Sequence, residues 1–278
     1  MNDSTSLSGN SQSDKSGVAE AAQTSKIAFL GRKSVYLLPN SFTTASLFFG
    51  LYAIVQATNG LFESAVFAIF YSMILDGMDG RVARMTNTQS DFGVQYDSLA
   101  DMVAFGVAPA VVLYTWVLKD LGKFGWLAAF VYCAGAALRL ARFNTRTAVV
   151  DKRWFQGLPS PAAAAIVAAL VWLVVDNHLP IKDGFLPWVA WGVAVYAGIS
   201  MVSTLPFYSF KVLDLGASVP FWVFLILVFV GFGVISTDPS RMLCLVFVVY
   251  GLSGYVVAAA RLFHRFRKQT KTKSRYPL

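Results

Sequence analysis

The chain has few charged residues and almost no cysteine. Only 14% of its 278 residues are Asp, Glu, Lys or Arg, against about 25% in an ordinary soluble domain, so little of the sequence suits a surface exposed to water. The two cysteines, Cys133 and Cys244, lie in apolar stretches, which excludes a disulfide scaffold and a cysteine-based zinc site. Hydrophobic residues make up 56% of the chain, and the mean hydropathy is +0.57. The composition excludes a disordered chain, a collagen-like fibre and an ordinary nucleic-acid-binding domain, and it leaves an integral membrane protein.

Long apolar segments predict an all-α fold, a polytopic bundle of membrane helices. A spanning helix needs about 20 mostly apolar residues, and the sequence offers about eight such segments. Turn-forming and helix-breaking residues, such as Asn59-Gly60 and Pro180, separate several of them. The candidate spans are 36–57, 63–85, 97–118, 125–144, 160–177, 185–205, 219–236 and 241–263.

The positive charges favour an even number of spans. If the N-terminus is cytoplasmic, 19 of the 23 Lys and Arg residues fall on the cytoplasmic side and 4 on the other side. Short cytoplasmic segments of membrane proteins carry such an excess of Lys and Arg. The net charge of +8 then reflects orientation and contact with anionic lipid headgroups, not nucleic acid. We therefore expect both termini on the cytoplasmic side.

Polar segments flank the predicted spans. Residues 1–25 are rich in Ser, Gly, Gln and Asp and contain no aromatic residue, so we expect them to be disordered, and no signal peptide is visible there. Residues 26–35 are expected to lie at the membrane interface as a lead-in. Residues 36–215 form the core, 216–263 add two transmembrane helices, and 264–278 form a basic cytoplasmic tail.

Four carboxylates lie within or at the ends of two apolar segments. Each costs about 2.5–3.5 kcal/mol at the centre of a spanning helix, which argues against a passive role. Residues three or four apart share a helix face, and the short connection 86–96 makes the two helices antiparallel, so the two pairs can meet. Converging carboxylates repel each other unless a hard cation lies between them, and oxygen ligands suit one or two Mg²⁺ or Mn²⁺ ions better than zinc. The acids are Asp76 and Asp79 on one helix and Asp97 and Asp101 on the next.

Small residues and an arginine accompany these acids. Gly77, Gly80 and Ala83 keep their helix narrow, and Gly93 opens the turn into the next helix. Arg84 lies one turn beyond Gly80 and can hold a phosphate through two hydrogen bonds. The combination of acids, cation, small residues and arginine predicts a diphosphate-binding site.

This pattern resembles the signature of the CDP-alcohol phosphatidyltransferase family. Eight positions match at fixed spacing, in the order Asp76-x2-Asp79-Gly80-x2-Ala83-Arg84-x8-Gly93-x3-Asp97-x3-Asp101. Segments on either side resemble the family's bacterial integral-membrane phosphatidylserine synthases, so the resemblance runs from about residue 35 to 215. Those segments are Leu37–Thr43, Leu47–Gly50, Arg139–Asn144, Phe155–Pro161 and Pro206–Lys211.

The resemblance implies the transfer of a phosphatidyl group from CDP-diacylglycerol to L-serine, which gives phosphatidylserine and CMP. It implies that the four aspartates bind Mg²⁺ or Mn²⁺ and that Asp101 is also the general base. It further implies that Gly80, Ala83, Arg84 and Gly93 line the CDP moiety. The resemblance also implies a homodimer in the inner, cytoplasmic membrane with its active site facing the cytoplasm. No cysteine or histidine is placed to serve as a covalent nucleophile, which favours direct attack in one displacement.

Other polar residues near the cytoplasmic ends have two interpretations each. Asn40 or Thr43 binds the cytidine, or the segment simply begins the first helix. The serine carboxylate needs a cation, and arginine pairs with carboxylates well, but the same residues can also serve as topology signals, loop residues or helix caps. The candidates for binding the acceptor or a lipid phosphate are Arg139, Arg142, Asn144, Ser160 and Lys211.

Two alternatives remain open at this point. The same chemistry can use another acceptor alcohol, such as glycerol 3-phosphate or an inositol compound. A protein of another class, a cation or proton transporter, can also place aspartates within the membrane. A transport pathway would spread its acids over several helices at different depths, whereas these acids gather at the cytoplasmic end of two helices.

Overall fold

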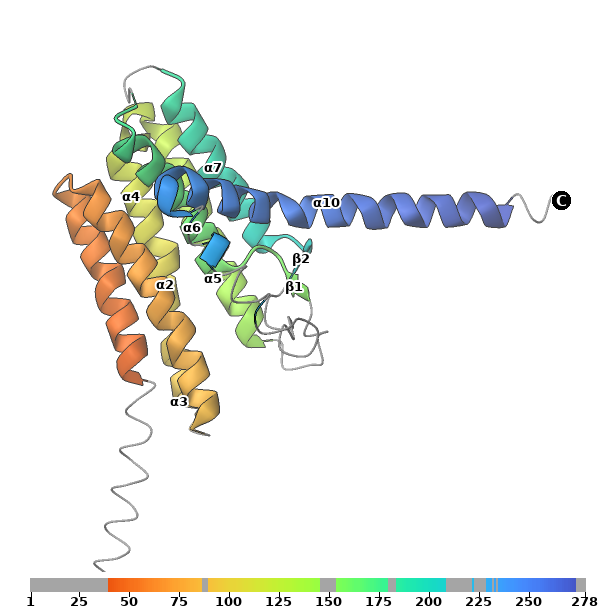
Figure 1. The fold of residues 1–278 in the computed structure, drawn as a ribbon, viewed down its shortest axis with the longest axis horizontal. Helices are drawn as coiled ribbons and strands as arrows, with labels where there is room; N and C mark the ends of the chain where they lie inside the picture. The colour runs from red at the N-terminus through yellow and green to blue at the C-terminus, as the bar shows by residue number, and fades with distance from the viewer. Residues whose placement is uncertain are drawn as a thin grey trace, which may run out of the picture.

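The protein is mostly helical in its computed structural model (Figure 1). The structure describes residues 40–86, 90–145, 154–179, 184–208, 222, 229–231, 233 and 235–273. The first helix covers residues 40–58. The helices that follow are α2 (Phe62–Met85), α3 (Asp91–Asp101), η1 (Met102–Val107), α4 (Ala108–Trp116), η2 (Leu118–Leu121), α5 (Lys123–Thr145), α6 (Ser160–Asp176), α7 (Leu186–Val202) and α10 (Pro239–Lys273).

The helical content and the long apolar helices are consistent with a helical membrane protein. Among the described residues, three helices are long and apolar enough to cross a membrane: Asp91–Trp116, Lys123–Thr145 and Pro239–Arg261. Two shorter apolar helices, Ser160–Asp176 and Leu186–Val202, coincide with predicted spans. The predicted span 219–236 lies largely outside the described residues. The count of eight spans and the cytoplasmic position of both termini stay predictions.

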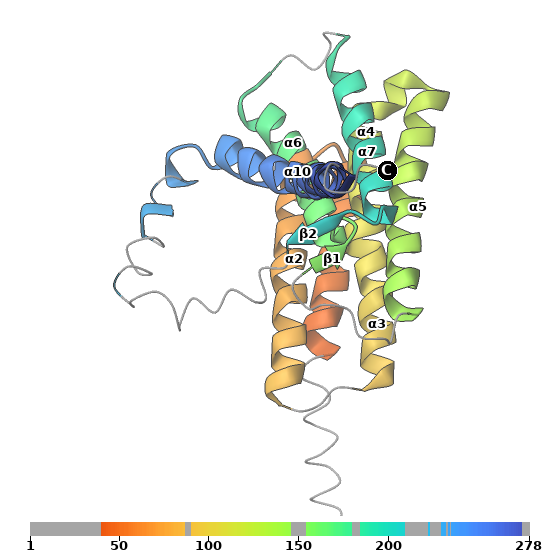
Figure 2. The same ribbon diagram turned by 90° about the vertical axis from the view of Figure 1, so that its right-hand side faces the viewer.

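Local sequence signals explain where several helices begin. Asn59 and Gly60 form the turn between the first helix and α2, and Gly60 has a φ of +78°, which glycine adopts without strain. Ser90 caps α3 by accepting a hydrogen bond from the backbone N–H of Gly93 at 3.0 Å. Proline occupies the first turn of α6 and of α7, where a missing N–H costs nothing. Helix α2 ends at Met85 and α3 begins at Asp91, and the two helices run in opposite directions (Figure 2).

Small residues bring the helices close together. A Cβ at Gly135 of α5 would collide with the carbonyl oxygen of Gly198 on α7, and a Cβ at Gly198 would lie 2.7 Å from the carbonyl oxygen of Val131. A Cβ at Gly50 would lie 2.7 Å from the Cα of Ala104. Membrane helices associate through such small-residue contacts because lipid offers no hydrophobic drive between them. The core is accordingly rich in alanine, with Ala128, Ala136 and Ala194 fully buried.

A short two-stranded sheet departs from the all-α prediction. Strands β1 (Trp154–Gln156) and β2 (Pro206–Tyr208) pair antiparallel, with Phe155 opposite Phe207 and Gln156 opposite Pro206. The two strands belong to two segments that sequence analysis singled out separately. Strand β1 precedes α6 and strand β2 follows α7, so their pairing joins the segment before α6 to the segment after α7.

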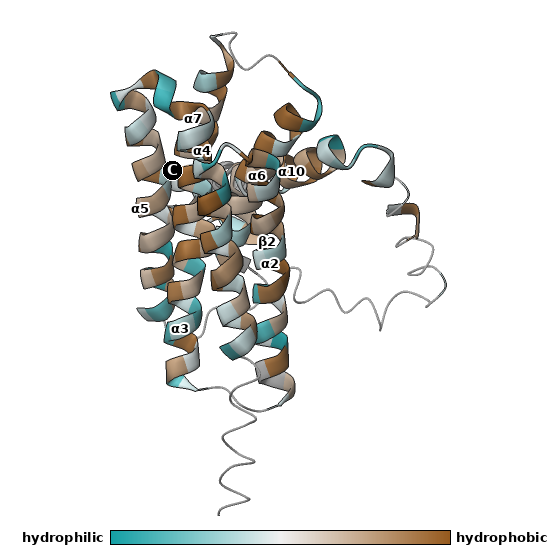
Figure 3. Cartoon of the chain, turned by 90° about the vertical axis from the view of Figure 1, so that its left-hand side faces the viewer, coloured by the Kyte–Doolittle hydropathy of each residue, from teal (hydrophilic) through white to brown (hydrophobic). Residues whose placement is uncertain are grey.

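Helix α10 takes a different course from the bundle. It runs across the other helices, and its C-terminal part extends away from them (Figures 1 and 2). The predicted span 241–263 lies within it, but the helix begins at Pro239 and continues to Lys273, into the predicted tail. Along the bundle, hydrophobic stretches alternate with segments of intermediate hydropathy. Hydrophilic residues gather toward the lower ends of α2 and α5 (Figure 3).

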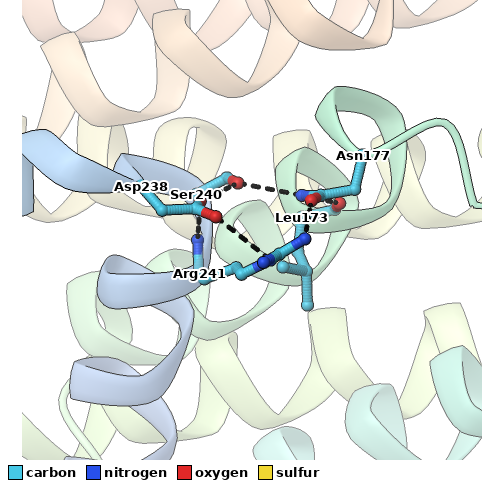
Figure 4. A network of polar contacts seen from close by, with 5 residues as sticks. All are labelled: Leu173, Asn177, Asp238, Ser240 and Arg241. Carbon is cyan, nitrogen blue, oxygen red and sulfur yellow. Dashed lines mark hydrogen bonds and ion pairs between the residues drawn. The ribbon is translucent and has the colours of Figure 1, made fainter.

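A polar network attaches the start of α10 to the end of α6 (Figure 4). Arg241 forms an ion pair with Asp238 at 3.1 Å and donates to Oδ1 of Asn177 at 2.6 Å. The amide nitrogen of Asn177 donates to Ser240 at 3.1 Å and to the carbonyl of Leu173 at 3.0 Å. These contacts satisfy carbonyl and side-chain groups at two helix ends that would otherwise need water.

Candidate active site

Three aspartates from two antiparallel helices converge near one end of the bundle. Asp76 comes from α2, whereas Asp97 and Asp101 come from α3. Each offers a carboxylate oxygen, and these oxygens all lie within 4.8 Å of one another. All three side chains are half-buried. The predicted meeting of the two helices through their acids is therefore present, with three of the four predicted aspartates in the group.

Asp79, the fourth aspartate, has a different environment. Its side chain is only 6% exposed and accepts a hydrogen bond from Thr43 Oγ1 at 2.7 Å. Thr43, which the sequence suggested for the cytidine, thereby ties the first helix to α2. Asp79 lies outside the group of three whose oxygens are within 4.8 Å. Its role as a metal ligand stays a prediction.

The small residues leave open space beside the acids. A Cβ at Gly77 or Gly80 would meet no atom within 4 Å. A Cβ at Gly93 would lie 3.2 Å from Ser90 Oγ and 3.6 Å from Asn40 Oδ1, so Asn40 and Gly93 are neighbours across two helices. Ala83 and Arg84 belong to α2, but their side chains lie outside what the structure describes, as does all of Lys211.

Arg139 lies beside the carboxylates. Its Nη1 donates to Ser160 Oγ at 2.9 Å, and its charge interacts with Asp101 and Asp76. Its Nε is buried and has no hydrogen-bond partner in the described part of the chain. Ser160 is fully buried at the start of α6. Two predicted acceptor residues, Arg139 and Ser160, are therefore in direct contact, and the charge of Arg139 acts on Asp101.

Arg142, one turn farther along α5, joins backbone segments. Its two terminal nitrogens donate to four carbonyl oxygens from the end of α7 and from β1, at 2.8–3.2 Å. The acceptors are the carbonyls of Gln156, Met201, Val202 and Ser203. A cation near the last turn of a helix satisfies its unpaired carbonyls. Arg142 therefore holds the end of α7 against β1, a structural role that the sequence did not predict.

Asn144 faces α3 and not the loop before α6. It donates to Ser98 Oγ at 3.0 Å, and Ser98 lies between Asp97 and Leu99 on α3. Sequence analysis missed Ser98, and it also missed Tyr96, whose hydroxyl is 2.8 Å from Thr44 Oγ1. Both lie within one turn of the aspartates of α3. Their polar groups directly beside Asp97 in the sequence were the available signal.

The three-acid group suits a divalent cation. Carboxylate oxygens are the ligands that Mg²⁺ and Mn²⁺ prefer, and such a cation would offset the repulsion among the acids. Oδ1 of Asp101 is buried and has no hydrogen-bond partner among the described residues. A buried carboxylate oxygen of this kind is costly unless something positive contacts it, so the residues present fit a cation.

Comparison with known proteins decides the family. The sequence profile of CDP-alcohol phosphatidyltransferases matches residues 36–197, more than half of the chain. The chain belongs to the CDP-alcohol phosphatidyltransferase family. The matched range contains all the aspartates described above, together with Arg139 and Ser160.

The family's curated members include similar chains from distant organisms. The chain is 36% identical over 236 residues to a CDP-diacylglycerol–serine O-phosphatidyltransferase of Helicobacter pylori strain J99, covering 84% of this chain and 97% of the relative. It is 32% identical over 191 residues to the enzyme of the same name from Methanocaldococcus jannaschii, covering 68% and 82%. The match to the Bacillus subtilis enzyme is 38% identical over 133 residues, covering 48% and 74%. Family membership confirms the resemblance seen in the motif, and it gives no support to a transporter.

Proposed function

We propose that the protein transfers the phosphatidyl group of CDP-diacylglycerol to the hydroxyl of L-serine, giving phosphatidylserine and CMP. The observation that carries this proposal is the convergence of Asp76, Asp97 and Asp101 at family-specific spacing. The names of the relatives supply the acceptor, since relatives from bacteria and an archaeon are described as serine O-phosphatidyltransferases.

In the proposed site, Asp76, Asp97 and Asp101 hold a divalent cation, either Mg²⁺ or Mn²⁺. When bound, the cation supplies positive charge that offsets the charge of the diphosphate oxygens and of the departing CMP. Gly77 and Gly80 face open space, which lets the diphosphate approach α2. Asp79, held by Thr43, lies one turn beyond Asp76 and adds negative charge on the same helix.

Asp101 is the proposed general base. A serine hydroxyl is a weak nucleophile at neutral pH, so a nearby base must accept its proton during attack. Asp101 offers one carboxylate oxygen to the cation, which leaves its other oxygen to take that proton. A bond forms between the serine oxygen and the phosphatidyl phosphorus, while the bond from that phosphorus to the oxygen of CMP breaks. No covalent enzyme intermediate is needed.

Arg139 is the proposed partner of the serine carboxylate. The acids of α2 and α3 repel a carboxylate, so the acceptor needs a nearby cation, and the charge of Arg139 interacts with Asp101. Nη1 of Arg139 already donates a hydrogen bond to Ser160. Its Nε has no hydrogen-bond partner among the described residues and can donate to the serine carboxylate. Arg142 is less suited, because its terminal nitrogens already donate to four carbonyls. Asn144 and Lys211 stay candidates for the serine ammonium and a lipid phosphate, respectively.

The cellular setting is also part of the proposal. We place the enzyme in the inner membrane as a homodimer, with the acid cluster facing the cytoplasm. The support is the distribution of Lys and Arg residues, which puts the cluster's end of the bundle on the cytoplasmic side.

An acceptor assay tests the reaction. Purified protein in detergent is given CDP-diacylglycerol, a divalent cation and one alcohol: L-serine, glycerol 3-phosphate or inositol. We expect phosphatidylserine and stoichiometric CMP with serine and neither product above background with the other two. Product formation with glycerol 3-phosphate or inositol and none with serine would replace the proposed acceptor while keeping the reaction class.

A further inference from the structure

The span that carries Asp97 and Asp101 contains an unusual helical turn. The helix is continuous from Asp91 to Trp116, but residues Met102–Val107 form a π-helical turn, η1. The backbone N–H of Ala108 donates to the carbonyl of Val103, five residues back. The turn begins at the residue directly after Asp101. Single π turns within α-helices are rare and often occur at functional sites.

A proline and a tyrosine account for this turn. In an uninterrupted α-helix, the carbonyl of Phe105 would accept from residue 109, but Pro109 has no N–H and its ring crowds that carbonyl. The hydroxyl of Tyr132 on α5 donates to the carbonyl of Phe105 instead, at 3.0 Å. Tyr132 is fully buried, as is Phe105. The hydrogen bond therefore comes from a fixed side chain on another helix.

The turn redirects one part of the span relative to the other. In an uninterrupted α-helix, Asp97, Asp101, Ala108 and Val112 would share one face, because they are spaced by four, seven and four residues. One extra residue in a turn rotates the two halves by about 100° relative to each other. Ala108 and Val112 then lie fully buried in the core, while Asp97 and Asp101 face Asp76.

Close packing keeps the turn in place. A Cβ at Gly106 would lie 3.0 Å from the sulfur of Met102 and 3.2 Å from the Cβ of Ala136 on α5. On another side, Ala104 packs against Gly50 of the first helix. The turn is thus held between two helices, and the Tyr132 hydroxyl satisfies a carbonyl that Pro109 cannot.

We propose that Tyr132 is a positioning residue for the carboxylate cluster: its hydrogen bond to Phe105 holds the π turn that aims Asp97 and Asp101 at Asp76. The inference rests on the proposed divalent cation site and deepens it. Tyr132 does not touch the cation or the substrates. It acts through the direction in which the two aspartates point.

Metal binding without turnover tests this inference. Mn²⁺ alone is titrated into purified protein in detergent, and free Mn²⁺ is followed by electron paramagnetic resonance. We expect Tyr132→Phe to weaken Mn²⁺ binding by about tenfold or more, in the range seen when partners that orient metal ligands are removed. Tyr114→Phe, which removes a hydroxyl from α4 outside the π turn, should leave Mn²⁺ binding unchanged.

A second pair of variants separates positioning from mere stability. Pro109→Ala restores the missing N–H, which allows a regular α-helical turn, so we expect a folded protein with weakened Mn²⁺ binding. The double variant Tyr132→Phe/Pro109→Ala should regain thermal stability but not Mn²⁺ affinity. Recovery of wild-type Mn²⁺ affinity in the double variant would overturn the inference, because the hydroxyl would then be only a stabilising contact.

The outcomes also distinguish this inference from the cation site itself. If Asp97→Asn abolishes Mn²⁺ binding while Tyr132→Phe binds Mn²⁺ as the wild type does, the site stands and the positioning role falls. If the wild-type protein binds no Mn²⁺, both fall. If Tyr132→Phe does not fold, weakened binding in Pro109→Ala supports the inference and unchanged binding overturns it.

Discussion

Asp101 is the last residue of α3, directly before the π turn, and its carboxylate lies close to those of Asp76 and Asp97. In the proposed site one oxygen of its carboxylate binds the cation and the other accepts the serine proton. We expect Asp101→Asn to keep CDP-diacylglycerol binding and to lose turnover by about 10²-fold or more, the usual contribution of a general base. The test measures CDP-diacylglycerol binding by equilibrium dialysis and kcat with serine, for both the wild type and Asp101→Asn. A loss of less than about tenfold would remove Asp101 from the base role.

The two neighbouring arginines of α5 should behave differently. Arg139 contacts Ser160, and its charge interacts with Asp101 and Asp76. We therefore expect Arg139→Lys, which loses the planar fork but keeps the charge, to raise the KM for serine about tenfold. Such a change corresponds to about 1.4 kcal/mol. The KM for CDP-diacylglycerol should change little. Measuring both KM values in the same preparation provides the test, and an unchanged serine KM would move the acceptor pocket away from Arg139.

Arg142→Lys should act on stability first. A lysine ammonium is a compact point charge on a flexible chain and cannot reproduce the planar fork that joins α7 to β1. Hydrogen bonds to a charged group are worth about 1.5–3 kcal/mol, so the thermal midpoint in detergent should fall by several degrees. If the midpoint is unchanged and the serine KM rises, Arg142 binds the acceptor and the structural role is wrong.

At the scale of elements, the contact between α5 and α7 depends on glycine. Gly135→Ala would place a methyl group on the carbonyl of Gly198, and overpacking of this kind costs about 1–3 kcal/mol. Gly192→Ala is the matched control, because a Cβ there meets nothing within 4 Å and alanine favours a helix by up to about 1 kcal/mol. Thermal unfolding of both variants should show a loss for the first and no loss for the second. Equal stability would contradict the close packing of α5 and α7.

The elements also show what the sequence could and could not predict. Apolar segments of spanning length predicted the helices, because each must satisfy its own backbone within lipid. The spacing of Asp76, Asp97 and Asp101 predicted their convergence, since helical periodicity and a short connection suffice. The pairing of β1 with β2, the course of α10 and the contacts of Arg142 depend on packing between distant segments, and local patterns do not encode that packing. The π turn had a readable sign in Pro109, but its partner Tyr132 lies on another helix.

At the scale of the whole molecule, the predicted orientation can be tested by labelling. The native cysteines are replaced by alanine, and single cysteines are introduced by Lys182→Cys or Ser274→Cys. A membrane-impermeant thiol reagent should label position 182 in spheroplasts, and it should label position 274 only after permeabilisation. These outcomes follow from the excess of Lys and Arg on the cytoplasmic side. The opposite pattern would invert the topology and place the acid cluster on the other side of the membrane.

The account as a whole depends on a divalent cation held between α2 and α3. The most direct measurement is serine-dependent CMP release by pure protein as Mn²⁺ or Mg²⁺ is added back after chelation. It compares the wild type with Asp97→Asn and with Asp91→Asn, which alters an exposed acid outside the group of three. The account predicts no release under chelation, recovery with added cation in the wild type and Asp91→Asn, and no recovery in Asp97→Asn. Release that persists under chelation, or an Asp97→Asn variant as active as the wild type, would contradict it.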